Sequence, residues 1–200
     1  ITQSSSSSSF FNTSATDAVC LEEKSFSPLG KYIFLAPQVS LTEQQAQVLR
    51  KFVHGQLGSY YGHTSIECWN KSRWINEYNA HDVLVMTPSI FLEHLRRAYV
   101  DMKDIRLIVF DECHHARKSH PFNCVMREFY FQSSKRPKIL GLTACPTIGG
   151  LKVHGTKGRI DQQLNELEDN LDSKIIKRIV SSNANGNDQL AIGVGTNHMI

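Results

Sequence analysis

The chain has 200 residues, of which 40% are hydrophobic, so it is long enough to form one folded domain with a substantial core. Its 22 basic and 19 acidic residues leave a net charge of only +3, which excludes the overwhelmingly basic surface of a histone-like binder. The five cysteines follow no repeating interval and no apolar run approaches the roughly 20 residues of a membrane span, so we expect reduced thiols, a nuclear or cytoplasmic location and no membrane partner.

The two ends of the chain differ in composition from its middle. Six consecutive serines, Ser4 to Ser9, and the polar stretch after them predict a disordered or linker segment over residues 1–29. The stretch from Ser181 to Gly195 is rich in Asn, Gly and Ser, which predicts a flexible tail over residues 179–200. Residues 30–178 are left as the folded domain.

Short apolar runs alternate with helical patterns through this domain. Strands are predicted at Tyr32–Ala36, Val83–Met86, Leu107–Phe110 and Ile139–Leu142, with a weaker strand near Leu57–Tyr61. Helices are predicted over the apolar positions from Leu41 to Val53 and around residues 70–79, 89–99 and 121–131. Strict alternation implies crossover connections and a mostly parallel sheet with helices on both faces.

A further apolar series near the end of the domain has the spacing of one helix face. Its members are Ile160, Leu164, Leu167, Leu171 and Ile175. This spacing predicts residues that pack against the core.

Polar residues follow the predicted strands at the edge where ligands of parallel sheets bind. They are Pro37–Gln38, Thr87–Pro88, Asp111–Glu112 and Thr143–Ala144–Cys145, in chain order. We therefore expect the chemistry of this protein at the carboxyl ends of its strands.

The strongest single signal is the buried strand that ends in Asp111 and Glu112, an arrangement typical of the Walker B site of nucleotide hydrolases. Asp111 can hold Mg²⁺ through water, because this ion sheds its hydration reluctantly. Glu112 can act as the base that polarises the attacking water. An isolated Asp-Glu pair is more often a solvated turn, and the longer string through His115 favours the catalytic interpretation.

Several other patterns are better explained as structure. Cys113, His114, His115, His120 and Cys124 lack a C-x-x-C pair, so we expect no zinc site. Trp69 and Trp74 could stack on nucleobases, although helix packing explains them more simply. The basic excess between Arg96 and Lys138 is typical of a solvated surface.

A P-loop, G-x-x-x-x-G-K-[ST], is absent from the sequence. The two glycines from Gly150 onward have the right interval, but Thr156 precedes Lys157 in reversed order. We therefore expect the 200-residue chain by itself to be inactive as an ATP hydrolase.

The residues that follow the strands carry a resemblance to a known family. DECHHA at 111–116 resembles motif II of superfamily 2 helicases, in the DECH variant shared by Dicers and innate-immune RNA sensor helicases. APQVSL at 36–41 resembles motif Ia, VLVMTPSIF at 83–91 the motif Ib region, and GLTACP at 141–146 motif III. The four motifs stand in family order.

Flanking residues favour the Dicer branch, particularly plant-type Dicer-like proteins. The supporting segments are YYGHTSIECWNKSRWINEY before motif Ib, HHARKSHPFNCVMREFY after motif II, and LNELEDNLDSKI at 164–175. The innate-immune sensor helicases share part of these segments. A sensor-type DECH RNA helicase is therefore the alternative to a Dicer-like protein.

The resemblance implies a fold, ligands and residue roles. The fold is α/β, a RecA-like sheet of the P-loop NTPase type that is incomplete at the N-terminus. ATP and Mg²⁺ are the implied cofactors, with Asp111, Glu112 and His114 at the nucleotide. Motif III, Thr143, Ala144 and Cys145, would couple the nucleotide to RNA, with His114 as the partner of Thr143. Cys145 stands where the family usually has serine, and its thiol is a weaker hydrogen-bond donor.

The same resemblance implies RNA contacts and partners. Pro37, Gln38, Thr87 and Pro88 match positions that touch the RNA backbone. The implied function is part of the ATP-dependent helicase or translocase domain of a Dicer-like endoribonuclease acting on double-stranded RNA. Its partners would be a second helicase domain and ribonuclease III domains of the parent chain. Neither is present in this sequence, so the chain should not cleave RNA.

Two further alternatives remain. Because the P-loop is missing, the chain could be a non-catalytic RNA-binding fragment. The serine-rich start and the Asn- and Gly-rich finish would also fit an incomplete gene product or a pseudogene. In the family that it resembles, the P-loop strand pairs with the strand before motif III, so its absence would leave Ile139–Leu142 as an unpaired apolar edge.

Overall fold

The computed structural model describes residues 30–62, 68–144, 157–179 and 190–196. The predicted linker 1–29 and Cys145 lie outside the described residues. Seven strands form one sheet in the order β2-β3-β1-β4-β5-β7-β6. Their bounds are β1 Lys31–Leu35, β2 Leu57–Tyr60, β3 Val83–Met86, β4 Ile105–Asp111, β5 Lys138–Thr143, β6 Ser173–Ile179 and β7 Leu190–Thr196.

The five strands β1 to β5 are mutually parallel, as predicted from the alternation of strands and helices. The helices between and after them are α1 Val39–Leu49, α2 Lys71–Ala80, α3 Pro88–Arg96, α4 Pro121–Val125 and α5 Lys157–Leu171. Two short 3₁₀ turns, η2 Met102–Asp104 and η3 Cys113–His115, flank β4. The predicted helix over 121–131 is α4 followed by one π-helical segment, η4 Met126–Tyr130.

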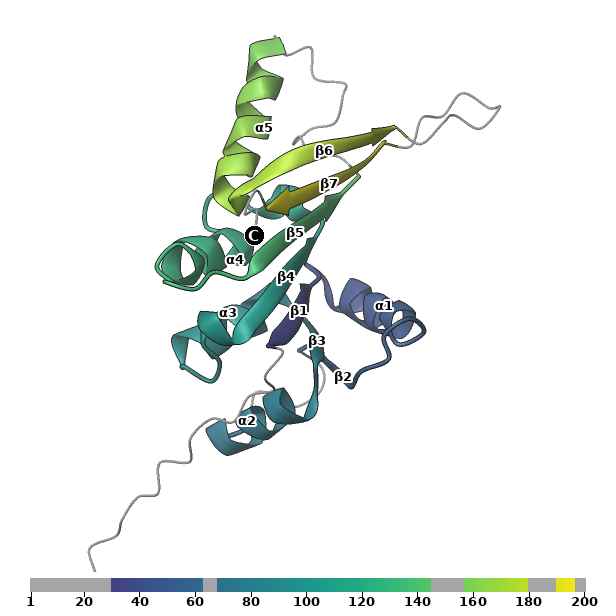
Figure 1. Cartoon of the computed structure of the whole chain (residues 1–200), viewed down its shortest axis with the longest axis vertical. Coiled ribbons are helices and arrows are strands. Elements are labelled where there is room, and N and C mark those ends of the chain that lie inside the picture. Colours follow the sequence, from purple (N-terminus) through teal and green to yellow (C-terminus); the bar gives the residue numbers. More distant parts are fainter. Residues whose placement is uncertain (1–29, 63–67, 145–156, 180–189, 197–200) are drawn as a thin grey trace, which may run out of the picture.

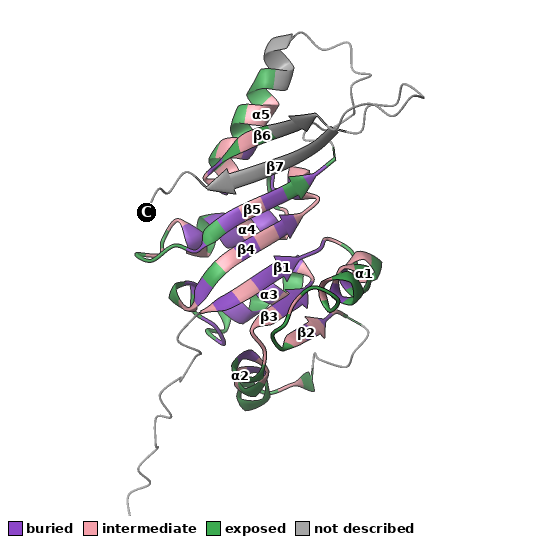
Figure 2. Ribbon diagram, turned by 45° about the vertical axis from the view of Figure 1, so that its right-hand side comes forward, coloured by how far each residue is buried: buried purple, intermediate pink, exposed green. Residues whose placement is uncertain are grey.

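Helices cover both faces of the sheet, with α1 on one side and α2 to α5 on the other (Figure 1). Alternate residues of each strand divide between these two cores. Leu35, Met86 and Phe110 pack beneath α2 to α5, whereas Phe34 and Val85 pack beneath α1. Figure 2 shows the result, with buried residues concentrated on the central strands and exposed residues on the outer surface of α1. The predicted fold class is confirmed.

The strand β7 corrects two expectations. It lies inside the predicted flexible tail, and it pairs antiparallel with β5, with Leu142 opposite Gly193. Residues 139–142 are therefore not the unpaired edge that the sequence predicted. Backbone groups of an edge strand accept any extended partner, and the short run 190–196 was hidden within Asn- and Gly-rich surroundings. The tail residues 180–189 and 197–200 lie outside the described part.

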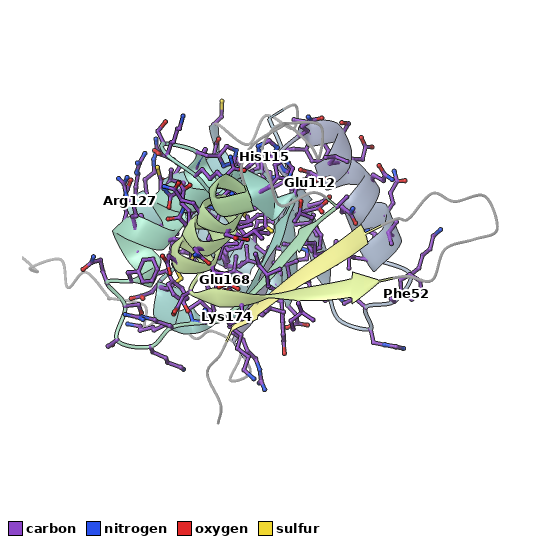
Figure 3. All side chains as sticks on the ribbon, turned by 90° about the horizontal axis from the view of Figure 1, so that it is seen from above. Phe52, Glu112, His115, Arg127, Glu168 and Lys174 are labelled. Carbon is purple, nitrogen blue, oxygen red and sulfur yellow. The ribbon has the colours of Figure 1, made fainter. Side chains whose placement is uncertain are left out.

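The apolar series of the last helix is also divided differently from the prediction. Leu167 and Leu171 are buried against the core, as expected. The helix then ends, because Asp172 adopts a left-handed conformation with φ 48°, and Ile175 belongs to β6. Glu168 and Lys174, which form a 3.0 Å hydrogen bond, mark this junction in Figure 3. Among the described residues, no helix has the length and apolarity of a membrane span.

Candidate functional site

Asp111 ends β4 at the carboxyl edge of the parallel sheet. One carboxylate oxygen, Oδ1, accepts a hydrogen bond from the Glu112 backbone N–H at 3.1 Å. The other, Oδ2, accepts a hydrogen bond from the Gln45 side chain of α1 at 3.2 Å. The pKa of Asp111 is raised from its ordinary value, because burial disfavours the charged form more than these two donors favour it. A cation beside this carboxylate would offset that cost.

Glu112 turns the chain sharply after the strand. Its φ of 52° lies in the left-handed region, which side chains other than glycine seldom occupy. Strained backbone of this kind recurs at functional sites. Figure 3 labels Glu112 and His115, which stand at the two ends of the short turn after β4.

Thr143 and His114 hold the Glu112 carboxylate. Thr143 Oγ1 donates to Glu112 Oε2 at 3.4 Å, and His114 Nδ1 lies 3.2 Å from the same oxygen. His114 Nδ1 also lies 2.9 Å from Thr143 Oγ1, the contact predicted from the motifs. A proton on Nδ1 satisfies all three contacts, because the imidazole and the hydroxyl then both donate toward the carboxylate. The Oε1 oxygen of Glu112 has no partner among the described residues.

Burial lowers the pKa of His114, and the neighbouring His115 lowers it further, while the Glu112 carboxylate opposes both effects. The imidazole is therefore neutral at physiological pH and donates without carrying a charge. A neutral donor holds the Glu112 carboxylate without compensating its negative charge.

The cysteines and histidines between Cys113 and Cys124 differ in burial and in role. Cys113 is fully buried, and burial raises the pKa of its thiol to about 12. His115 is exposed, and His120 caps α4 by accepting a hydrogen bond from the Phe122 N–H at 3.2 Å. Within the described ranges, no group of three or more His, Cys, Asp or Glu side chains is arranged to hold a metal.

Sequence reasoning missed the contacts that fasten the turn after motif II to α5. Arg117 is 6% exposed and binds the Glu166 carboxylate at 2.7 Å and the Gln163 carbonyl at 2.8 Å. Asn170 donates to the Ala116 carbonyl at 2.9 Å. Gln45 was missed as well, because its contact with Asp111 joins residues 66 positions apart. A motif search carries no signal for such pairs.

The predicted RNA positions lie at the same edge of the sheet. Pro37 is partly exposed and Gln38 exposed, and the turn that holds them is fixed by Thr42, whose hydroxyl donates to the Gln38 carbonyl at 2.9 Å. Thr87 is partly exposed and precedes α3. Pro88 is buried at the start of α3, so we assign it a structural role instead of the predicted RNA contact. Ala144 is exposed just beyond β5.

Comparison with known proteins agrees with this geometry. The sequence model of the DEAD/DEAH box helicase family matches residues 15–152, beginning inside the predicted linker. The chain is 41% identical over 143 residues to Endoribonuclease Dicer homolog 3 of Arabidopsis thaliana, and 38% identical over 144 residues to Dicer-like protein 1 of Aspergillus terreus. These matches cover 72% and 71% of this chain but only 9% of each relative.

A solved structure gives the same result for the fold. The helicase domain of Pyrococcus furiosus Hef superposes with a TM-score of 0.53 at 27% identity, over 69% of this chain and 27% of that one. Family match, relatives and fold agree. The chain therefore belongs to the DEAD/DEAH box helicase family and carries helicase-region sequence of the Dicer-like kind.

Proposed function

We propose that this chain forms part of an ATP-driven motor that acts on double-stranded RNA within a Dicer-like endoribonuclease. The observation that carries the proposal is the shared hold of Thr143 and His114 on Glu112 Oε2, at the edge where the RNA candidates also lie. One carboxylate is thereby oriented by residues at the carboxyl ends of two neighbouring strands.

The residues present fit Mg²⁺. Asp111 offers a half-buried carboxylate whose charged form is disfavoured by burial, and hard oxygen ligands are those that Mg²⁺ prefers. Asp111 would hold the ion through water. When bound, Mg²⁺ supplies charge neutralisation at the phosphates.

Glu112 and its two partners supply the chain's own chemistry. Because Oε2 is held by Thr143 and His114, the remaining oxygen Oε1 is the atom at which Glu112 accepts a proton from water. Any displacement of Thr143 with β5 changes that hold. This supports a coupling role for Thr143, Ala144 and Cys145 between RNA and the nucleotide.

RNA contact is proposed at Pro37, Gln38 and Thr87. These residues follow β1 and β3, which flank one another in the sheet. Backbone amides and hydroxyls at such turns position the sugar-phosphate chain without reading its bases. The fixed turn at Gln38 supports this role, because its carbonyl is held by Thr42.

The chain spans about a tenth of the length of the curated relatives that it matches. Cleavage of double-stranded RNA, a second helicase domain and ribonuclease III domains as partners, and a nuclear or cytoplasmic location are therefore proposals.

Binding of a fluorescent RNA duplex and of Mg²⁺·ATP to the chain, followed by anisotropy and calorimetry, tests the proposal. We expect duplex binding that is indifferent to sequence, and a calorimetric signal with Mg²⁺ that Asp111→Asn removes. Absence of duplex binding at low salt would overturn the RNA role, and an Mg²⁺ signal unchanged by Asp111→Asn would overturn the metal assignment. Lys103→Ala, far from this edge, serves as the matched control.

A further inference from the structure

A cavity lies between α2 and α3, on the face of the sheet opposite α1. Its volume is about 300 Å³, and its apolar walls are formed by Trp69, Trp74, Ile90 and Tyr99. Glu93 and Arg97 also line it, and their charges pair with each other at 2.6 Å. This volume is at the lower end of the range for small-molecule sites, which run from about 300 to 1,000 Å³. The cavity therefore suits one compact, flat, largely apolar group.

His94 gives this cavity a buried polar group. The side chain lines the cavity and is only 4% exposed. Its Nδ1 lies 3.0 Å from the hydroxyl of the fully buried Tyr78. Its Nε2 has no hydrogen-bond partner among the described residues, and protein atoms do not bury it completely. The free nitrogen thus remains accessible from the cavity.

The Tyr78 contact fixes the tautomer of His94. Burial keeps the Tyr78 hydroxyl protonated, and His94 Nδ1 is the partner that the structure gives it. The hydroxyl therefore donates to Nδ1, which leaves the proton of the neutral imidazole on Nε2. Burial lowers the pKa of His94 to about 3, so the ring stays neutral. The cavity presents an N–H donor without a charge.

Arg73 extends the aromatic wall toward solvent. Its guanidinium lies over the Trp69 ring, 3.9 Å from the ring centroid. The ring of Trp69 in turn packs on Trp74 with centroids 4.8 Å apart. Arg73 is exposed and forms no ion pair among the described residues, so its charge is available beside Trp69, which lines the cavity.

A nucleobase with its attached phosphate matches this combination of surfaces. Bases stack on aromatic rings and on guanidinium planes, and their edges carry acceptors for an N–H donor. The guanidinium of Arg73, beside Trp69, is complementary to phosphate. The cavity shares α3 with the proposed RNA surface, because Ser89 and Ile90 line it in the first turn of the helix that Thr87 precedes.

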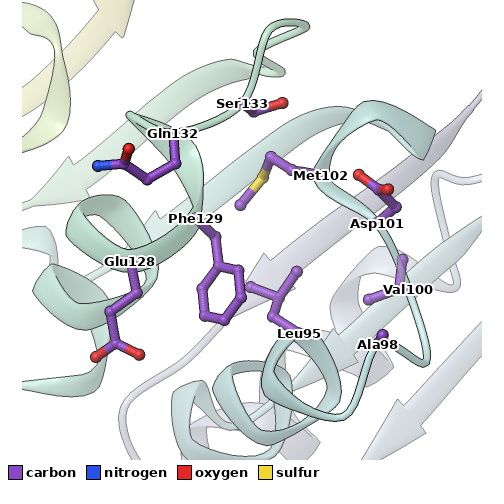
Figure 4. Close-up of a pocket in the computed structure, with 9 residues that line it drawn as sticks. All are labelled: Leu95, Ala98, Val100, Asp101, Met102, Glu128, Phe129, Gln132 and Ser133. Atoms are coloured by element: carbon purple, nitrogen blue, oxygen red, sulfur yellow. The ribbon is translucent and has the colours of Figure 1, made fainter.

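The other prominent cavity does not share these properties. It has about 330 Å³ and lies at the amino ends of β4 and β5, where Figure 4 shows Leu95, Phe129 and Met102 around it. Its lining has neither a tryptophan nor a histidine, and its two carboxylates are paired, Asp101 with Lys103 and Glu128 with Arg96. It lies about 20 Å from Asp111, the length of β4 at about 3.3 Å per residue.

We propose that the cavity between α2 and α3 binds one unpaired nucleobase of the RNA, with His94 Nε2–H donating to the base edge and Arg73 placed against its phosphate. This inference rests on the proposed function, since RNA must first reach the carboxyl edge of the sheet. The cavity would recognise an unpaired base, whereas the rest of the proposed RNA surface contacts only the sugar-phosphate backbone.

The chain itself supplies the reporter for a test, because both of its tryptophans line this cavity. A blunt RNA duplex and the same duplex with one bulged adenosine are titrated against the chain. Labelled RNA reports affinity, and tryptophan fluorescence, excited where nucleobases do not absorb, reports occupancy of the cavity. We expect the bulged duplex to bind about tenfold more tightly, in line with the energy of stacking one base. Only the bulged duplex should quench the tryptophans.

Two variants and one control make the test specific. His94→Phe keeps a ring but removes the donor, and the exposed Arg73→Ala keeps the fold even if His94→Phe does not. Each should remove the preference for the bulged duplex. Arg127→Ala, exposed on η4 and marked in Figure 3, removes the same charge elsewhere and should preserve the preference.

The outcomes separate the two proposals. Equal affinity for both duplexes without quenching overturns the base site and leaves the proposed function standing. Failure of both duplexes to bind, with quenching by adenosine monophosphate alone, supports the base site and overturns the RNA role of the surface. Quenching by N-acetyl-tyrosine amide but not by adenosine monophosphate overturns the nucleobase assignment in favour of an aromatic peptide.

Discussion

His114 Nδ1 and Thr143 Oγ1 lie 2.9 Å apart, although 29 residues separate them in the chain. The contact joins the turn after β4 to the end of β5, and both residues reach the same oxygen of Glu112. We expect Thr143→Val to lower the free energy of unfolding by about 1 kcal/mol, the usual net contribution of one hydrogen bond. Urea unfolding measures it. A double-mutant cycle with His114→Ala should give a coupling energy clearly above zero, and strict additivity would contradict the contact.

Catalysis depends on Glu112 and on a phosphate cradle that these 200 residues lack. The chain by itself should show no ATP turnover, because no P-loop holds the phosphates. In a longer form that carries a P-loop, Glu112→Gln should lower kcat by about 100-fold or more while ATP binding is retained. A coupled phosphate-release assay with calorimetry measures both. RNA-dependent turnover by the 200-residue chain, lost in Glu112→Gln, would refute the first part.

Asp111 should make the stability of the chain depend on pH. Its pKa is higher in the folded state than in the unfolded state, so the folded state retains its proton longer as pH rises. The resulting loss of stability is absent below about pH 3.8 and complete above the raised pKa. Asp111→Asn should therefore raise Tm at neutral pH and leave it unchanged in strong acid. Scanning calorimetry across pH checks this, with Asp161→Asn on exposed α5 as the control.

RNA binding through backbone contacts should be strongly dependent on salt. For about three phosphate contacts, a fourfold rise in salt should weaken binding about 40-fold. Changing the base sequence of a blunt duplex should have little effect, because phosphates carry no sequence information. Anisotropy at two salt concentrations decides it. Affinity that survives high salt would point to a different mode of recognition.

The strand β7 should protect β5 from self-association. Truncation after Gln189 removes β7 and exposes the backbone edge of β5, which recruits other chains. We expect this variant to elute from gel filtration as larger species and to melt without cooperativity. Truncation after Thr196 keeps both strands of the hairpin and should remain a monomer. Identical elution of the two variants would show that β7 does not cover this edge in solution.

The sequence by itself determined the parallel core and the ends of its strands. Apolar runs such as Val83–Met86 are set by local burial, and Asp111 and Glu112 follow a strand whose pattern is readable without a structure. The contact of His114 with Thr143 could also be predicted, because the motifs that contain them resemble a known family.

Only the tertiary structure decided the contacts between residues far apart in the chain. Gln45 reaches Asp111 because α1 packs over β4, and β7 reaches β5 from a segment whose composition resembles a loop. Likewise, the burial of Pro88 and the free Nε2 of His94 follow from how α2 and α3 pack. Local patterns encode periodicity and turn chemistry, whereas these relationships depend on which surfaces meet once the chain has folded.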